Sequence, residues 1–545
     1  MKKILALLLA LTMVFALVAC GPKADTPDPG KTDVPGVSEQ PGNTDAPAPV
    51  REEIVVATRT ATALTPWGTN NGTPGNYEVY EMLYECDSKG NMYPLLADAR
   101  VEGNILPGCN NVPGSGVYTV KIYDYIKDHK GNAITAEDIA FCYNYQRENA
   151  ETKGWNDLQK VEALDATTVQ FTFAKDQTNV GQLLNILCRQ FIVDEQEFKA
   201  DQGGFTTTMC GTGPYKFVKY ESGSALYLER NEDYWQTNAE LRRPEQQANL
   251  KKITYKFIDE TSQQVIALKT GTVDLVSGMA DLDAAKAFAD GGEFADKFSV
   301  YQYQQKFVNY LNPNCSEQSI MSDINMRLAV FNAIDRQGLV TALGENFSPL
   351  YAYANNYYGD YEWVDFEGMD NYNTRKSVDP AVVKSYLDKA GYKGEKIVLI
   401  AQDSDPATII AGMLQAQNIN CEAKILDRTS MQQTQGDPAA WDLEMGMMAG
   451  DANVTVWQHG LDWGKTNMTS NFIADKEWKG LLDKCQTQEG HNAENMKAWW
   501  EYAVENAYTM GLYAAKTNVI IPQDMVTLVM GDKEGILAGA SIYGG

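Results

Sequence analysis

Histidine and positive charge are scarce in this sequence, and each shortage excludes a class of function. Only three of the 545 residues are histidine, and His129, His459 and His491 stand too far apart to form an H-E-x-x-H zinc motif. Lys and Arg number 46 against 72 Asp and Glu, which gives a formal net charge of −26 at pH 7. Because a surface this acidic repels polyphosphate, the sequence excludes a DNA or RNA partner.

Closely spaced cysteines and long apolar runs are also missing. None of the nine cysteines belongs to a C-x-x-C pair, so a zinc or thioredoxin-type site has no support. Buried free thiols and disulfides of undetermined connectivity both fit the cysteines that follow Cys20. Only one apolar run has any length, which excludes a polytopic membrane protein. No metal ion or cofactor is expected.

The chain begins with a pattern typical of an export signal. Two lysines precede an apolar run at residues 4–19, whose only polar member is Thr12. As a helix this run would extend about 24 Å, short of the roughly 30 Å of a bilayer core, so a permanent membrane span is the weaker interpretation. The residues before Cys20 resemble the bacterial lipobox. We therefore predict a lipoprotein signal peptide at residues 1–19 and a lipid anchor at Cys20, with a plain secretory signal as the alternative.

Residues 20–53 are predicted to form a disordered tether behind this anchor. The stretch from 21 to 50 holds seven prolines, four glycines and four aspartates but no aromatic residue. Too little apolar surface is present to offset the entropy of ordering it. A Pro-rich chain of this length reaches up to about 90 Å when extended, so the folded body can stand clear of the membrane.

From residue 54 onward strand and helix patterns alternate, which is typical of an α/β protein. Thr135 and Asp138 form a capping pattern at the start of one helix, and Asp379 and Gly391 bound another. A hairpin is expected at residues 215–229. Further strands are expected at 118–123, 253–258, 273–276, 397–400, 421–426 and 441–447, and further helices at 262–270, 323–336 and 407–417. The sequence contains no internal repeat.

Seven blocks stand out in this part of the chain. They are residues 76–83 (NYEVYEML), 118–141 (YTVKIYDYIKDHKGNAITAEDIAF), 211–215 (GTGPY), 231–235 (NEDYW), 270–275 (TGTVDL), 326–336 (MRLAVFNAIDR) and 389–392 (KAGY). In this order they resemble extracellular solute-binding protein family 5, the receptors that deliver peptides, nickel and other solutes to ABC importers. The likeness extends over residues 54–530.

The blocks also have structural causes. Gly211 and Gly213 are expected to adopt backbone conformations that side chains forbid. Asp335 and Arg336 are expected to form a solvated helix end. These residues therefore identify the fold rather than the ligand.

The resemblance implies an α/β fold of two lobes that close over a solute like a hinged trap. This is the periplasmic-binding-protein-like fold of class II, or cluster C, with an extra subdomain in the larger lobe. Lobe I would comprise residues 54–310 and 519–545, with the subdomain inserted at about 85–210, and lobe II residues 311–518. The chain would cross between the lobes near 307–312 and 515–519. Closure would remove water from the ligand and strengthen its polar contacts.

Residues 441–453 (WDLEMGMMAGDAN) give the most specific indication of the ligand. In oligopeptide-binding members of the family a similar run has two aspartates nine residues apart, and the second pairs with the peptide α-ammonium. Asp442 and Asp451 keep that spacing, although Met448 stands where the family often has tryptophan. A buried ammonium needs a charged partner, so the resemblance makes Asp451 the expected anchor, flanked by Met448 and Gly450. A loop or capping acid is the alternative for Asp451.

Aromatic residues gather near this run and indicate a cleft without fixing its content. Trp67, Tyr353 and Trp457 are predicted ligand contacts because each stands in a loop-like stretch, and core or surface packing is the alternative for each. Arg327 is predicted to form a salt bridge within its lobe rather than to meet a ligand carboxylate.

We therefore predict a monomeric substrate-binding lipoprotein on the outer face of the bacterial cytoplasmic membrane. It would capture short peptides and pass them to the permease subunits of an ABC importer, without catalysis. Oligosaccharide, nickel and haem ligands are alternatives within the family, and a sensing receptor is another. A lipid-anchored hydrolase is the enzyme alternative, although the sequence has no G-x-S-x-G elbow and only a shortened phosphate-loop pattern at residues 460–466.

Overall fold

The structure is a computed structural model of the whole chain. The chain divides into two units, Met1–Pro47 and Ala48–Gly545, and every described residue belongs to the second. The described residues are 52–67, 73–86, 92–112, 114–149, 158–174, 186–201, 204–243, 246–279, 282–350, 363–366, 377–449, 471–485, 490, 492–523, 525–527 and 541–542.

One large mixed sheet organises this unit. Its strands are ordered β15-β14-β16-β12-β17-β11-β1-β10-β9-β8, and β13 pairs with β17 beside this path. β1 is parallel to β10 and β11, and β14 is parallel to β15 and β16. The strands are β1 (Glu53–Thr58), β8 (Tyr215–Glu221), β9 (Ala225–Arg230), β10 (Lys252–Phe257), β11 (Leu275–Met279), β12 (Phe298–Pro313), β13 (Phe347–Pro349), β14 (Ile397–Ala401), β15 (Cys421–Ile425), β16 (Leu443–Ala449) and β17 (Met510–Pro522).

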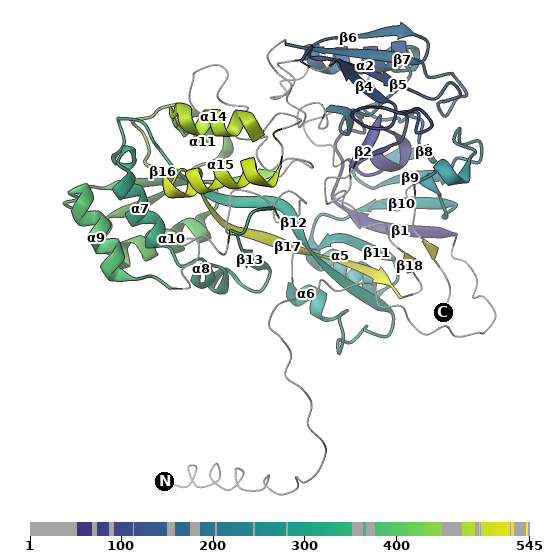
Figure 1. Cartoon of the computed structure of the whole chain (residues 1–545). Helices are drawn as coiled ribbons and strands as arrows, with labels where there is room; N and C mark the ends of the chain where they lie inside the picture. Colours follow the sequence, from purple (N-terminus) through teal and green to yellow (C-terminus); the bar gives the residue numbers. More distant parts are fainter. Residues whose placement is uncertain are drawn as a thin grey trace, which may run out of the picture. The chain divides into compact units, whose positions relative to one another are not determined.

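The two long antiparallel strands β12 and β17 join the halves of this sheet. They run side by side through its middle (Figure 1). Their register breaks between Gln304 and Val308, where three residues of β12 face one residue of β17, and again after Asn309. Because bulges bend a strand and increase its twist, we expect the sheet to bend at this point.

A smaller antiparallel sheet, ordered β4-β5-β7-β6, packs against helix α2 (Figure 1). Two further strand pairs, β2 with β3 and β18 with β19, lie outside both sheets. These strands are β2 (Tyr84–Cys86), β3 (Met92–Pro94), β4 (Cys109–Val112), β5 (Val117–Lys121), β6 (Leu158–Asp165), β7 (Thr168–Phe173), β18 (Met525–Thr527) and β19 (Ser541–Ile542).

The helices confirm most of the predicted α/β pattern. Strand, helix and parallel strand follow one another in β10-α5-β11 and in β14-α10-β15, and the predicted hairpin is β8-β9. The helices are α1 (Asn76–Val79), α2 (Ala136–Asn149), α4 (Glu195–Ala200), α5 (Thr261–Lys269), α6 (Leu282–Lys286), α7 (Ile324–Asn332), α8 (Arg336–Leu343), α9 (Pro380–Ala390), α10 (Ser404–Ala416), α11 (Arg428–Gln435), α14 (Lys476–Cys485), α15 (Ala493–Glu505) and the 3-10 turns η1 (Ala239–Leu241) and η3 (Ile320–Ser322).

One predicted helix is wrong in its extent. The pattern at residues 323–336 favours a single helix, but α7 ends at Asn332 and α8 begins at Arg336. Asp335 separates the two because its carboxylate accepts a hydrogen bond from Gly338 N–H at 2.9 Å and caps α8. The cap at Asp379 is confirmed, since its carboxylate accepts from the first turn of α9.

Strand β17 contributes to the two largest hydrophobic cores and, through Ala514 and Ile520, to two smaller clusters. Its residue Val519 belongs to a core whose other members stand mainly between residues 54 and 275. Its residue Tyr513 belongs to a second core, whose members stand between residues 311 and 513. The change of core along β17 therefore falls between Tyr513 and Val519, whereas the lobe boundaries themselves stay a prediction.

Several of the sequence blocks meet inside the first core. Glu81 is 3% exposed and accepts hydrogen bonds from Tyr234 Oη at 2.5 Å, Trp235 Nε1 at 2.7 Å and Gln246 Nε2 at 2.6 Å. Burial raises the pKa of the Glu81 carboxyl, and the three donors oppose that rise. A buried carboxylate whose partners come from distant segments fixes those segments relative to one another, which is a structural role.

Gly211 and Gly213 are needed for close backbone approach, and the expectation of unusual backbone angles is wrong. Neither residue has a positive φ. A Cβ on Gly211 would lie 2.2 Å from Val79 O, and one on Gly213 would lie 2.4 Å from Glu78 O. The Gly213 N–H donates to Val79 O at 2.8 Å, so two backbones touch where these blocks meet.

Two arginines of the 326–336 block are buried, which corrects the expected solvated helix end. Arg336 is 5% exposed, and its Nη1 donates to the carbonyls of Leu350 at 3.0 Å and Gly511 at 3.3 Å. Arg327 is also 5% exposed and forms no ion pair among the described residues, so its predicted salt bridge is wrong. Its guanidinium instead donates to the carbonyls of Met321, Ser322 and Asn506.

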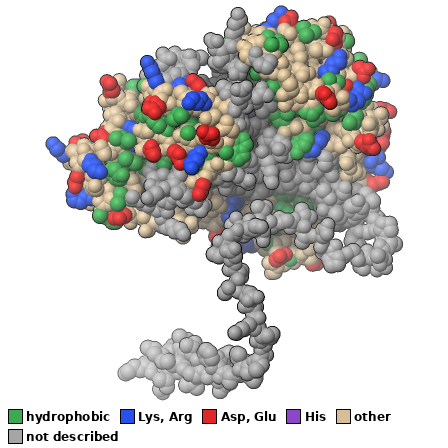
Figure 2. Space-filling view, viewed as in Figure 1, with side chains coloured by type: hydrophobic (Ala, Val, Ile, Leu, Met, Phe, Trp, Pro, Cys, Tyr) green, Lys and Arg blue, Asp and Glu red, His purple; other side chains and the backbone are tan. Residues whose placement is uncertain are grey.

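Charge and cysteine follow simple patterns in this part of the chain. Figure 2 shows Lys and Arg interspersed with Asp and Glu over the visible face, so the acidic excess is not gathered in one area there. The thiols are free and buried, apart from a half-buried Cys315, at Cys109, Cys142, Cys188, Cys210, Cys315, Cys421 and Cys485.

We predict that Gly213→Ala lowers the free energy of unfolding by about 2 to 4 kcal/mol, because the new methyl group would overlap the backbone of α1. Gly480→Ala in α14 is the matched control, since no atom lies within 4 Å of its added Cβ. Removing a glycine from an open helix position is expected to raise stability by about 0.5 to 1 kcal/mol. Urea unfolding followed by circular dichroism checks both, and equal effects would contradict the backbone contact.

Candidate functional site

Strand β16 carries the run that the sequence links to the ligand, and it ends beside the long central strands. It begins opposite Pro313 of β12 and ends with Ala449 opposite Phe307. Phe307 lies in the register break of β12 and β17, between Gln304 and Val308. The C-terminal end of β16 therefore lies where the two cores part.

Strand β16 pairs with β12 on one side and with β14 on the other, and it extends beyond the end of β14. β14 pairs with β16 only as far as Ala401, opposite Met445. Among the described strands, none pairs with that edge of β16 after Met445. Residues 446–449 consequently offer backbone N–H and C=O groups along one side. An unpaired strand edge is a template for pairing with a second extended chain.

Met447 is exposed at this end of β16. Its side chain is 62% exposed, whereas Leu443 and Met445 are 0% and 4% exposed and belong to the second core. Alternate residues of a strand share one face, so the three side chains point to the same side of the sheet. The layer that covers this face therefore ends between Met445 and Met447.

The opposite face of β16 rests on Tyr310. A Cβ on Gly446 would lie 2.3 Å from Tyr310 Oη, so this contact requires glycine. Tyr310 Oη donates to Glu444 Oε1 at 3.3 Å, and Gln435 Nε2 donates to the same oxygen at 2.6 Å. Glu444 is 3% exposed. These contacts fix the position of β16 from the face opposite Met447.

Asp442 has a structural role at the start of β16. Its Oδ1 accepts a hydrogen bond from Ser319 Oγ at 2.6 Å, and its Oδ2 accepts one from Val398 N–H at 2.9 Å. Its own N–H donates to Val398 O at 2.9 Å, and its carbonyl accepts from Asn314 N–H at 2.8 Å. Both carboxylate oxygens of Asp442 are therefore engaged within the protein.

The other predicted contacts of this run are described only in part. Met448 lies on β16, where its backbone is paired with Val308. Five of the predicted residues lie outside the described residues and stay predictions: Gly450, Asp451, Trp457, Tyr353 and the lipidation site Cys20. The sequence analysis did not single out Met447, because exposure on a strand depends on where the neighbouring layer ends.

Trp67 packs into an aromatic cluster beside the first core. Its ring centroid lies 4.6 Å from that of Phe198, 5.1 Å from that of Tyr145 and 6.2 Å from that of Phe141. Its indole N–H donates to Phe191 O at 2.9 Å. The side chain is half-buried. Packing accounts for these contacts, and a ligand contact by Trp67 stays a prediction.

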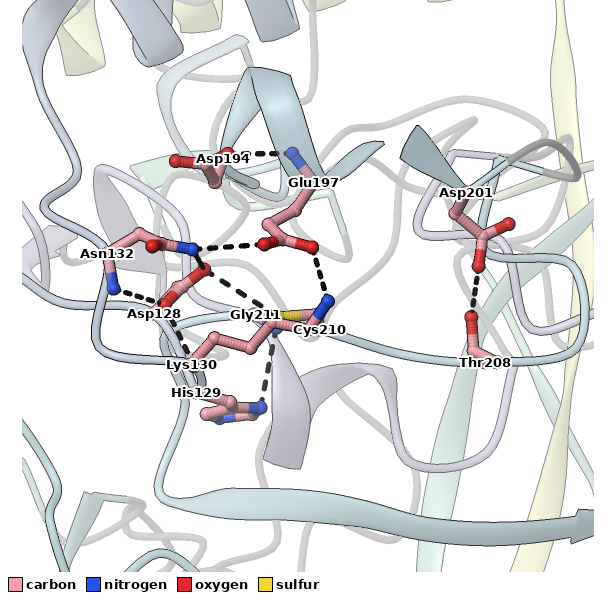
Figure 3. Close-up of polar contacts among 10 residues, drawn as sticks. All are labelled: Asp128, His129, Lys130, Asn132, Asp194, Glu197, Asp201, Thr208, Cys210 and Gly211. Atoms are coloured by element: carbon pink, nitrogen blue, oxygen red, sulfur yellow. Dashed lines mark hydrogen bonds and ion pairs between the residues drawn. The ribbon is translucent and has the colours of Figure 1, made fainter. Parts of the chain in front are cut away.

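A second polar cluster surrounds the turn at Asp128, where Figure 3 shows the side chains turned toward one another. The Asp128 carboxylate accepts from Lys130 N–H at 2.9 Å, Asn132 N–H at 2.8 Å and Asn132 Nδ2 at 2.9 Å, and the Cys210 thiol lies 3.7 Å away. Lys130 forms an ion pair with Glu197. Burial raises the pKa of Cys210 to about 12, which keeps its thiol protonated and unreactive. The cluster is thus satisfied internally.

His129 belongs to the same turn and is held neutral. Its Nε2 lies 2.9 Å from Gly213 O and therefore carries the donated proton, while its Nδ1 lies 3.4 Å from Gly211 N–H and accepts. Burial lowers the pKa of His129 to about 4. The hydrogen bond that Nδ1 accepts requires the neutral ring. This histidine therefore fixes the glycine segment rather than serving as a general base.

The described residues offer no obvious resident metal site. No group of three or more His, Cys, Asp or Glu side chains within them is placed to hold a metal ion. The helices among them are all too short or too polar to cross a bilayer. The remaining candidate is the end of β16, with the exposed Met447 and a backbone edge that no described strand pairs with.

The mixed sheet, its two cores and the long strands that join them define an α/β solute-binding protein of the two-lobed, periplasmic-binding-protein-like type. The family profile described as bacterial extracellular solute-binding proteins, family 5 Middle, matches residues 91–476. The chain belongs to bacterial extracellular solute-binding protein family 5. The predicted family and fold class are confirmed.

Relatives and solved structures agree with this assignment. The oligopeptide-binding protein AppA of Bacillus subtilis is 23% identical over 494 residues, which cover 82% of this chain and 82% of that protein. The crystal structure of a putative peptide-binding protein AppA from Clostridium difficile has a TM-score of 0.72 at 18% identity and covers 90% of this chain and 100% of that chain. NikZ from Campylobacter jejuni in complex with Ni(L-His) has a TM-score of 0.65 at 16% identity, covering 90% and 99%.

We expect Asp442→Ala to lower the free energy of unfolding by about 2 kcal/mol, because it leaves Val398 N–H and Ser319 Oγ without their acceptor. Ligand affinity of the folded protein should stay within twofold of wild type. Urea unfolding and ligand titration measure the two quantities. Asp437→Ala, which removes an exposed carboxylate from the same region, is the control and should change stability by less than about 0.5 kcal/mol.

His129 predicts a pH dependence of stability. Its pKa is about 4 in the folded chain against 6.5 in the unfolded chain, so the unfolded chain alone takes up a proton between these values. Stability is therefore full above pH 6.5 and is lost as the pH falls towards 4, by about 2 kcal/mol between pH 7 and pH 5. His129→Gln keeps an amide donor without titrating. Urea unfolding at both pH values should show a smaller loss for this variant, and equal losses would contradict the assignment.

Proposed function

We propose that this protein is the substrate-binding lipoprotein of an ABC importer, which captures short peptides between two lobes and delivers them to a membrane permease. The unpaired edge of β16 carries the proposal. An extended peptide can add to residues 446–449 as a further strand, so that main-chain hydrogen bonds give affinity for peptides of many sequences. The similarity to an oligopeptide-binding protein supports the same ligand class.

The location of the β16 edge suits a mechanism in which two lobes close around a ligand. It lies at the register break of β12 and β17, where the core changes from one half of the sheet to the other. We infer that lobe I comprises residues 54–310 and 519–545, with its subdomain at about 85–210, and that lobe II comprises residues 311–518. A ligand bound beside the joining strands would be enclosed when the lobes rotate, which removes water from its polar contacts.

Asp451 is the proposed anchor for the peptide α-ammonium. It stands two residues after Ala449, the last residue of β16, in the sequence. Met448, Gly450, Trp457, Trp67 and Tyr353 are the further proposed contacts. Binding, closure and release require no bond to be made or broken, so we propose that the protein is not an enzyme.

The proposed location follows from the first 53 residues. An export signal at residues 1–19 would place the body outside the cytoplasm, and a lipid on Cys20 would hold it on the outer face of the membrane through the Pro-rich tether. There it would meet the permease as a monomer. A nickel chelate is the second candidate ligand, favoured by the likeness to NikZ.

Thermal unfolding of the full chain, purified in detergent, tests the ligand class. Pooled di- to octapeptides, pooled cello- and xylo-oligosaccharides, haem, and Ni²⁺ with L-histidine are compared. A ligand at 100 times its dissociation constant should stabilise the protein by about 2.7 kcal/mol, and we expect this with peptides alone. With Asp451→Ala, at least tenfold more peptide should be needed for the same rise in unfolding temperature, because the ammonium group of the bound peptide loses its charged partner.

Asp442→Ala is the matched control, since this acid stands in the same run but is engaged within the protein. It should lower the unfolding temperature and keep the peptide shift. A shift with sugar, haem or nickel and none with peptides would sink the peptide assignment. A peptide shift that survives Asp451→Ala would remove only the proposed anchor.

A further inference from the structure

The exposure of Met447 calls for a reason, because Leu443, Glu444 and Met445 of the same strand are buried. Most other large, exposed apolar side chains lie on edge strands, helices or loops, as Val218 on β8 and Ile425 on β15 do. Met447 instead lies on a strand of the central region, paired through Asn309 with β12. At 62% exposure it offers a large apolar surface next to the unpaired backbone edge.

Met447 begins a row of side chains that crosses the sheet. It lies opposite Asn309 of β12, which lies opposite Tyr513 of β17, which lies opposite Pro349 of β13. Directly opposed residues point to the same face, so this row shares the face of the second core. Exposure falls along it from Met447 through a half-exposed Asn309 to Tyr513 at 3%. The row therefore runs from the buried second core at Tyr513 to solvent at Met447, and we call its exposed part, Met447 and Asn309, the step.

Asn309 adds polar groups to this step. Among the described residues its side-chain amide makes no hydrogen bond, so both its carbonyl oxygen and its NH₂ group are available. The next residue of the row is fixed, because the Tyr513 ring packs edge-on against Phe347 with centroids 5.3 Å apart. The Met447 thioether, an amide that makes no hydrogen bond among the described residues, and the packed Tyr513 ring thus follow one another along the row.

The strand beneath Met447 is also held in place. Tyr310 supports the opposite face, where Gly446 leaves room for its hydroxyl and Glu444 accepts its hydrogen bond. A methionine side chain on a fixed strand is flexible and polarisable, which suits contact with apolar groups of varied shape. The Met447 side chain is therefore suited to contact an apolar side chain of a peptide. The Asn309 amide is suited to form hydrogen bonds with the peptide main chain.

We propose that Met447 and Asn309 form a specificity subsite that accepts one apolar side chain of the bound peptide. This rests on the proposed function, because the ligand must lie along the edge of β16 to reach both residues. Met447 covers the apolar side chain, and Asn309 bonds the main chain of the same or the next ligand residue. The subsite would make the receptor prefer an apolar residue at one position while tolerating different shapes there.

Titration calorimetry of the full chain in detergent with five tetrapeptides tests this subsite. The probes are tetra-alanine and the four peptides in which one alanine is replaced by leucine. Wild type should prefer leucine over alanine about tenfold at one position and less than threefold at the others. Met447→Ala should reduce that preference to about twofold, and Met447→Leu should keep it. Asn309→Ala should weaken all five peptides by a similar factor of about five.

Ile425→Ala is the matched control, because it shortens an exposed apolar side chain on the same sheet, at the β15 edge. It should leave the leucine preference unchanged. A preference that survives Met447→Ala, or a wild type that binds all five peptides equally, would overturn the subsite and leave peptide capture standing. A wild type that binds none of the five peptides would overturn the proposed function and the subsite together.

Discussion

The pairing of β12 with β17 is the constraint on which the rest of the structure depends. These strands alone carry the sheet from one core to the other among the described strands. Their ladder is interrupted between Gln304 and Val308. An irregularity of this kind is expected to bend the sheet locally while the two strands stay joined. Hydrogen-bonded strands resist separation yet can twist about a bulge. A body built on such a joint keeps its two cores intact while their relative angle changes, which is what capture by closure requires.

Several of the seven sequence blocks are explained by contacts between backbones and buried polar groups. Glu81 gathers three donors from distant segments, the neutral ring of His129 bonds both glycines of the 211–215 block, and those glycines touch α1. Changing one partner of such a contact is expected to destabilise the fold. A buried polar group without a partner, or an overlapping methyl group, costs more free energy than an average interaction contributes. Such residues identify a fold reliably and carry little information about the ligand, since they lie away from β16.

The sequence predicted most local structure because local signals are strong there. Period-two and period-3.6 patterns located the strands and helices of the β10-α5-β11 and β14-α10-β15 units, and the Asp379 cap was recognisable from its position before proline. Tertiary contacts produced the errors. Arg336 and Arg327 are hydrophilic residues, and their burial depends on carbonyl groups from distant chain segments. Gly213 has no positive φ, and glycine is needed there because neighbouring backbone atoms lie too close for a Cβ. Met447 could not be found because the run L-E-M-G-M-M contains three methionines that only the surrounding layers distinguish.

The candidate site combines two kinds of recognition that differ in what they demand of a ligand. An unpaired strand edge bonds to any extended backbone, so residues 446–449 would give affinity without selecting a sequence. Selection then has to come from side chains. Asp442, close by in sequence, is engaged by Ser319 and Val398. Among the side chains of β16 that the structure describes, the exposed one is the flexible thioether of Met447. A receptor that accepts many peptides, as proposed here, would gain from this division, because backbone pairing would supply the common part of the free energy and one adaptable contact would bias the choice.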